Sequence, residues 1–98
     1  MTAKISTARI NTLKTAFPAT DLDIVEGQDG STTFIQSFYD PKADPRTCEA
    51  HAVLEVEVDR SREVTLTFYQ EETTEQHRAN GYLDLLDAIK NFQRAATR

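Results

Sequence analysis

Few side chains in this 98-residue sequence could take part in chemistry, and they are scattered along it. There is one cysteine, Cys48, and two histidines, of which His51 lies three residues after it. A base beside a thiol can raise its thiolate fraction, so this pair has the residue types of a thiol–imidazole dyad. Residues three apart on a strand project to opposite faces, however. We therefore predict no nucleophilic dyad here, and His51 is expected on the outer face of a strand, beside Glu55 and Glu57.

Two carboxylates, Glu55 and Glu57, have a spacing that general acid–base catalysis could use. Two residues apart on a strand, their side chains would lie about 7 Å from each other on one face. Such catalysis also needs a concave and partly dry pocket. A flat, exposed strand face provides none, so we interpret these residues as part of an acidic surface and predict no catalytic residue.

The sequence contains no motif for a cofactor or a metal ion. It lacks a glycine-rich phosphate loop, a nucleophile elbow, a Cys-x-x-Cys pair and a His-Glu-x-x-His helix. A single cysteine cannot form an internal disulfide, and no partners stand at the spacing of a structural zinc site. We therefore expect no cofactor and no bound metal.

The charge is unevenly distributed along the chain. The net charge is −5, and residues 21–77 contain fourteen acids but only four bases. This acidic middle would repel the phosphate backbone, which disfavours direct binding of nucleic acid. An acidic surface instead favours a basic protein as the partner.

Nothing in the sequence predicts a membrane protein or a secreted protein. No apolar run approaches the roughly 18 residues that span a bilayer, and Met1 to Pro18 lacks the apolar segment of a signal peptide. Cys48 is best interpreted as an ordinary reduced thiol. We expect a cytoplasmic protein without a membrane contact.

Two segments have the apolar periodicity of helices. Lys4 to Phe17 has one apolar stripe, and Pro18 would end that helix. Thr74 to Ala96 has another, interrupted by Gly81, and His77 would lie in its first turns. Either Gly81 lies inside a continuous helix, which we favour, or the helix begins near Gly81 and residues 71–80 form a loop. Acids at the start of this helix, Glu71, Glu72 and Glu75, would complement the positive end of its dipole.

Four segments have the composition of strands. Leu22 to Glu26 and Thr32 to Tyr39 flank a turn with two glycines, residues 27–30, although the facing of the second strand is ambiguous. Ala50 to Asp59 and Glu63 to Gln70 alternate clearly and predict a hairpin with an acidic outer face. Two Asp-Pro pairs mark the segment Asp40 to Arg46 as a loop.

These elements predict a single α+β domain over residues 1–98. Short links make antiparallel neighbours, so we expect a four-stranded antiparallel meander with the N-terminal and C-terminal helices packed on one face. One core would bury the apolar positions of the helices and the hairpin, namely Ile10, Leu13, Phe17, Leu54, Val56, Leu66, Phe68, Leu86, Ile89 and Phe92.

The opposite face of the sheet would remain open, which leads to a hypothesis about function. We expect a small, acidic, non-enzymatic protein-binding module: an inhibitor, an adaptor or a chaperone-like protein, of the kind that phages and other mobile elements encode as anti-CRISPR or immunity proteins. The predicted partner-binding residues on this face are Glu55, Glu57, Asp59, Thr67 and Tyr69. The Asp40–Arg46 loop is the alternative surface, and an unpaired strand edge or the open face would also allow a homodimer. The alternative function is a small dimeric enzyme with a pocket between sheet and helices.

Overall fold

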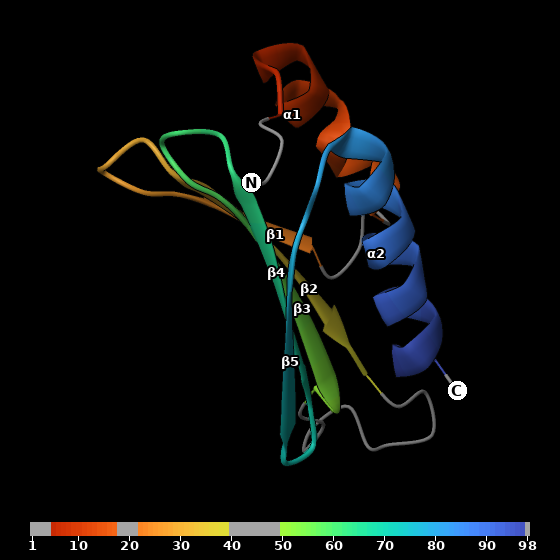
Figure 1. Cartoon of the computed structure of the whole chain (residues 1–98). Coiled ribbons are helices and arrows are strands. Elements are labelled where there is room, and N and C mark those ends of the chain that lie inside the picture. Colours follow the sequence, from red (N-terminus) through yellow and green to blue (C-terminus); the bar gives the residue numbers. More distant parts are fainter. Residues whose placement is uncertain (1–4, 18–21, 40–49, 98) are drawn as a thin grey trace.

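The fold is an antiparallel sheet with two helical segments packed on one of its faces (Figure 1). The computed structural model describes residues 5–17, 22–39 and 50–97. The strands follow the order β1-β2-β3-β4-β5, and every neighbouring pair is antiparallel. The predicted α+β class and meander are thus confirmed, with five strands instead of four. The elements are α1 (Thr7–Leu13), the 3-10 helix η1 (Lys14–Ala16), β1 (Leu22–Glu26), β2 (Thr32–Phe38), β3 (Ala52–Val58), β4 (Val64–Gln70), β5 (Thr73–Arg78) and α2 (Tyr82–Ala96).

The first helical segment is shorter than expected but ends where the sequence predicts. Ser6 is the N-cap, and its Oγ accepts a hydrogen bond from the backbone N–H of Arg9 at 3.2 Å. Phe17 then has extended backbone angles, φ −115° and ψ 150°. This conformation is what a following proline imposes on the residue before it.

The fifth strand corrects the prediction that residues from Thr74 onward belong to the last helix. Residues 73–78 pair with β4 instead, from Gln70 opposite Thr73 to Thr65 opposite Arg78. The turn between the two strands consists of Glu71 and Glu72, and Glu71 has a positive φ of 56°. These acids therefore form a hairpin turn and do not cap a helix. β5 was missed because its sequence, TTEQHR, is polar on both faces and because its turn lacks the usual glycine or asparagine.

The last helix begins directly after Gly81, so the prediction of a continuous helix is wrong and the alternative start is confirmed. The loop that this alternative placed over residues 71–80 is wrong, because β5 occupies Thr73–Arg78. Gly81 is the N-cap of α2, with φ 96° and ψ 172°. This region of the backbone map is essentially restricted to glycine. Gly81 thus allows the chain to turn sharply from the end of β5 into α2.

The core lies between the sheet and the helical segments. Leu85 and Ile89 of α2 are fully buried, as are Leu54 and Leu66 on the facing strands. The rings of Phe68 and Phe92 stack, with their centroids 5.0 Å apart. Seven of the ten predicted core residues are buried, and the other three, Ile10, Leu86 and Phe92, are partly buried against the same cluster.

One buried polar group joins three elements inside this core. Gln36 of β2 is 6% exposed, and its Oε1 accepts a hydrogen bond from Nε2 of Gln93 at 2.9 Å. The same nitrogen donates to the backbone oxygen of Ala16 at 3.2 Å. A buried amide needs such partners, and these bonds fix the position of α2 against β2 and η1.

Replacing Gly81 by alanine tests its role as the N-cap. In the observed conformation, Gly81→Ala should reduce the free energy of unfolding by about 1–3 kcal/mol, because a Cβ is poorly tolerated there. Inside a continuous helix, the same change should stabilise the protein by about 1 kcal/mol. Urea unfolding followed by circular dichroism separates the two, and a gain in stability would contradict the assigned start of α2.

The positive φ of Glu71 leads to a second prediction. Glu71→Gly should raise the free energy of unfolding by up to about 1 kcal/mol, because the left-handed region costs a residue with a side chain about 1–2 kcal/mol and part of this is lost again to the flexibility of glycine. Glu72→Gly is the matched control, since it removes the same charge from a residue without a positive φ. The same unfolding experiment should show no gain for the control, and equal effects would rule out backbone strain as the cause.

Candidate functional site

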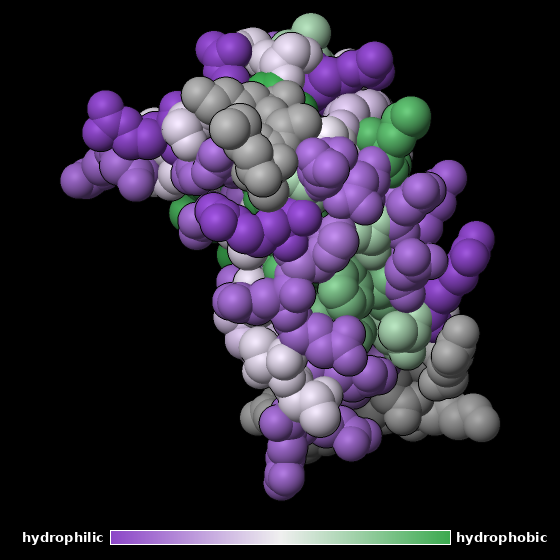
Figure 2. Space-filling model, in the orientation of Figure 1, coloured by the Kyte–Doolittle hydropathy of each residue, from purple (hydrophilic) through white to green (hydrophobic). Residues whose placement is uncertain are grey.

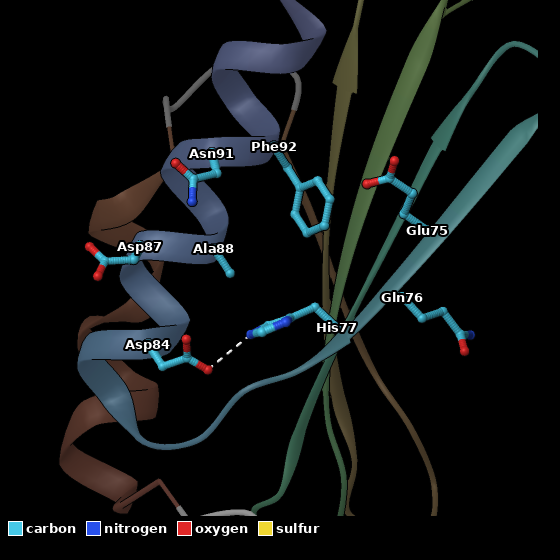
Figure 3. A pocket seen from close by; sticks show the side chains of 8 residues that line it. All are labelled: Glu75, Gln76, His77, Asp84, Asp87, Ala88, Asn91 and Phe92. Atoms are coloured by element: carbon cyan, nitrogen blue, oxygen red, sulfur yellow. Dashed lines mark hydrogen bonds and ion pairs between the residues drawn. The ribbon is translucent and has the colours of Figure 1, made fainter.

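The first candidate binding surface in the described part of the chain is a groove between β5 and α2. It has a volume of about 260 Å³ and is lined by Glu75, Gln76, His77, Asp84, Asp87, Ala88, Asn91 and Phe92 (Figure 3). In Figure 2, hydrophobic atoms are visible between the hydrophilic surfaces of β5 and of α2. The groove therefore has an apolar floor and acidic walls.

The polar centre of this groove is a contact between His77 and Asp84. Nε2 of His77 lies 2.9 Å from Oδ2 of Asp84, and the backbone N–H of Asn80 donates to the same oxygen at 2.7 Å. The Asn80 hydrogen bond, followed by the contact with His77, lowers the pKa of the Asp84 carboxyl. The contact joins the end of β5 to the first turn of α2. His77 lies on a strand and not on a helix, so the sequence analysis did not bring these two side chains together.

The chemistry available in this groove is limited. An imidazole beside a carboxylate is the feature that would favour the enzyme alternative. The eight lining residues include no serine, threonine, cysteine or lysine that could serve as a nucleophile. Within the described parts of the chain, no group of three His, Cys, Asp or Glu side chains could hold a metal ion. The observed contacts fit a structural link between β5 and α2.

The second surface is the outer face of the sheet, which is turned away from both helices. The pairing register brings Ile35, Glu55 and Thr67 side by side in one row across β2, β3 and β4. A neighbouring row on the same face contains Val53 and Tyr69. Four of the five predicted binding residues, Glu55, Glu57, Thr67 and Tyr69, thus share one face, as the alternation of this hairpin predicts. Their role in binding stays a prediction.

The exposure of these side chains differs. Tyr69 is 40% exposed and Glu57 is also exposed, whereas Glu55 and Thr67 are half-buried among their neighbours. The ring of Tyr69 is thus an accessible aromatic group on a face that otherwise carries mainly hydroxyl and carboxylate side chains. Tyrosine is enriched at protein–protein interfaces, whereas acids are depleted there, so Tyr69 is the side chain of this face that best fits a contact with a partner.

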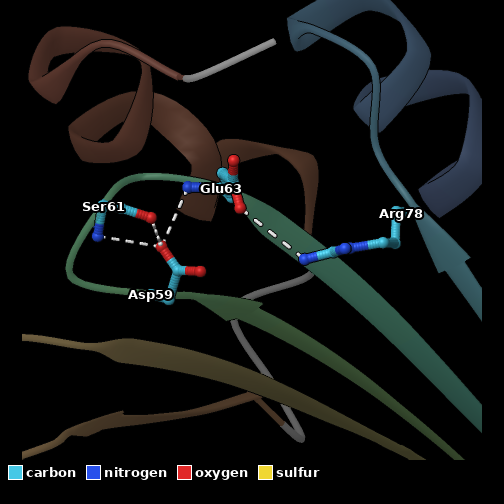
Figure 4. Close-up of polar contacts among 4 residues, drawn as sticks. All are labelled: Asp59, Ser61, Glu63 and Arg78. Atoms are coloured by element: carbon cyan, nitrogen blue, oxygen red, sulfur yellow. Dashed lines mark hydrogen bonds and ion pairs between the residues drawn. The ribbon is translucent and has the colours of Figure 1, made fainter. Parts of the chain in front are cut away.

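The fifth predicted residue, Asp59, has a structural role in the β3–β4 turn (Figure 4). Its Oδ1 accepts hydrogen bonds from the backbone N–H groups of Ser61, at 2.9 Å, and Glu63, at 3.0 Å. It also accepts one from the Ser61 hydroxyl, at 2.7 Å, and these bonds, chiefly the hydroxyl one, lower the pKa of Asp59. Beside this turn, Arg78 pairs with Glu63 at 3.6 Å.

The structure resolves the facing of β2, which the sequence left open. Phe34, Gln36 and Phe38 face the core, and Thr33, Ile35 and Ser37 therefore lie on the outer face. Gln36 made the pattern ambiguous because a glutamine in a core position is unusual. Its partner, Gln93, is more than 50 residues away, and no local signal could have indicated it.

The expected position of His51 is wrong. Its Nε2 donates to the backbone oxygen of Ala96, at the end of α2, over 2.7 Å, so the ring does not lie beside Glu55 and Glu57. His51 precedes Ala52, the first residue of β3, and strand alternation therefore does not set its direction. Cys48 and the Asp40–Arg46 loop lie outside the described residues.

Comparisons with known proteins provide no relative for this chain. No protein-family model matches it, and neither the curated proteins nor the solved structures gave a match. In the part of the chain that the structure describes, no helix is long and apolar enough to cross a membrane. The function must therefore be inferred from the surfaces themselves.

The lowered pKa of Asp84 predicts how pH changes stability. A carboxyl with a lower pKa in the folded state stabilises fully above its unfolded pKa, near 3.8, and loses this contribution as the pH falls through the folded pKa. Asp84→Asn removes the titration, so the stability difference between the natural protein and this variant should be largest above about pH 5 and shrink towards about pH 2. Urea unfolding across this range measures it.

Asp87→Asn is the control for this experiment, because it removes a charge one turn away without touching the His77 contact. It should not reproduce the pH dependence. A difference for Asp84→Asn that is constant from about pH 5 to about pH 2 would contradict the assignment.

Proposed function

We propose that this protein is a small protein-binding module whose binding surface is the outer face of the sheet. The observation that carries the proposal is that both helices pack on the same side, which leaves a five-stranded face without a cover in the described structure. Functions of this type include inhibitors, adaptors and chaperone-like proteins, some of them encoded by phages and other mobile elements.

The charges on this face favour a basic partner. Asp23, Glu55 and Glu57 lie on the outer side of β1 and β3. Arg78 is the only basic residue among the described outer-face positions of the five strands. Its charge is paired with that of Glu63. The face is therefore negative overall, and its charge would accelerate encounter with a positively charged protein surface.

The centre of the face offers a group that could supply binding energy. Tyrosine is enriched at positions that dominate binding, because its ring buries a large area while its hydroxyl keeps a hydrogen bond. Tyr69 stands beside Val53 and one row from Ile35, so an apolar patch adjoins the acids. We propose that Tyr69 and Thr67 contact the centre of the partner and that Glu55 and Glu57 orient it.

The test begins with affinity purification from the native host and mass spectrometry, followed by binding kinetics with the purified partner. Glu57→Lys should slow association by about tenfold at low salt and flatten its salt dependence. Tyr69→Ala should speed dissociation by about tenfold or more. Neither change should unfold the protein, because both side chains are exposed.

Each variant has a matched control on the helical side of the molecule. Asp87→Lys reverses an exposed acid on α2, and Leu83→Ala removes a side chain that is 78% exposed there. Both controls should bind like the natural protein. If the sheet-face variants bind normally, but binding is lost when residues 40–46 are replaced by a Gly-Ser segment, the loop is the binding surface and the proposal is wrong.

A further inference from the structure

The edge of the sheet formed by β5 has the properties of a pairing surface. β5 is the last strand of the sheet, and all of its residues are exposed except His77, which is half-buried. Edge strands are commonly protected from pairing by proline, lysine or a bulge. The sequence TTEQHR contains neither proline nor lysine, and its register with β4 is uninterrupted from residue 73 to residue 78.

The hydrogen bonds of this strand show which backbone groups point outward. The N–H of Ala79 donates to the carbonyl of Val64 at 2.9 Å. In an antiparallel ladder, alternate residues direct both backbone groups to the same neighbour. Residues 75 and 77 therefore bond to β4, and residues 74, 76 and 78 direct their N–H and C=O groups away from the sheet.

We propose that β5 pairs in antiparallel fashion with β5 of a second copy of this chain, about a two-fold axis through Gln76. Gln76 would exchange two backbone hydrogen bonds with Gln76 of the second copy. Thr74 would exchange two backbone hydrogen bonds with Arg78 of the second copy. By symmetry, Arg78 would exchange two more with Thr74 of the second copy. These are the outward-directed groups, so every bond of the new ladder has a donor and an acceptor in place.

The side chains favour this register over the one centred on Glu75. A continuous sheet requires that opposed residues lie on the same face, so the axis must pass through a residue. With the axis at Gln76, Glu75 of each copy lies opposite His77 of the other copy. These two symmetric pairs lie on the side of the sheet that carries α2. With the axis at Glu75, the two Glu75 carboxylates would stand opposite each other, and like charges in that position are destabilising.

The pairing would extend the proposed binding surface without covering it. A two-fold axis perpendicular to the sheet keeps both copies of α2 on one side, and the outer faces join into one surface. Next to the axis, His77 would lie between the second copy's Glu75 and Asp84 of its own chain, which is 2.9 Å from its Nε2. This inference does not depend on the proposed function, because edge pairing and binding at the outer face use different groups.

The first experiment measures mass against concentration by sedimentation equilibrium. The natural chain should approach twice the monomer mass of 11.1 kDa as the concentration rises. Gln76→Pro should remain a monomer. At a concentration at which the natural chain is also monomeric, both should have the same melting temperature, because the N–H that proline removes points away from β4. A natural chain that stays monomeric up to about 1 mM, roughly the weakest association this experiment detects, would overturn the proposal.

The second experiment tests the register even if Gln76→Pro fails to fold. In a Cys48→Ala background, Gln76→Cys should form an intermolecular disulfide, because opposed Cα atoms in such a pair are about 5.5 Å apart. Thr74→Cys is the control: it lies on the same face and strand, but the two copies of residue 74 would be roughly 14 Å apart along the ladder. Equal cross-linking, faster cross-linking at residue 74, or none at residue 76 would place the contact elsewhere, for example at β1 with its exposed Ile24 and Val25, and would overturn the proposal.

Discussion

The packing of α2 against β3 and β4 is the contact on which the rest of the structure depends. Leu85 and Ile89 meet Leu54 and Leu66 in a core where all four side chains are fully buried. A chain of this length can bury only one such layer, and each of its helical segments has a single apolar stripe. Among the described residues, one side of the sheet is therefore closed by helices, and no element covers the other side or either edge. The candidate surfaces follow from this constraint.

Polar contacts fix the position of α2, whereas apolar packing supplies most of the stabilisation. His77 holds the first turn through Asp84, whereas Gln36 holds the last turn through Gln93 and His51 donates to the carbonyl of Ala96. Each of these contacts comes from a different part of the sheet. An apolar stripe alone would allow the helix to slide along the strands, because hydrophobic attraction has no direction. Directional contacts at both ends of the helix prevent this.

The parts of the fold that could be predicted are those in which burial leaves a pattern in the sequence. β3 and β4 alternate because one side of each is covered, so Leu54, Leu66 and their acidic neighbours could be assigned correctly. β5 has no covered side and leaves no such pattern, and the apolar stripe of α2 could be extended backwards across Gly81. This single error placed His77 on a helix and hid its contact with Asp84. The outer face was predictable on β3 and β4, whereas its extension to β2 depended on the long-range partner of Gln36.

The composition of β5 has a physical consequence for the whole sheet. A strand without buried apolar side chains adds little hydrophobic stabilisation, so its place in the sheet depends on its backbone pairing with β4 and on the contact of His77 with α2. Pairing with β4 satisfies the backbone N–H and C=O groups of β5 that point towards β4. The N–H and C=O groups of the alternate residues point away from the sheet and remain available. By covering β4, β5 keeps the apolar side chains of the central strands away from the edge, where Leu66 and Phe68 would otherwise border solvent. The sheet thus ends in a polar strand, whose open edge differs from that of β1 with its exposed Ile24 and Val25, and the two edges are not equivalent as surfaces for association.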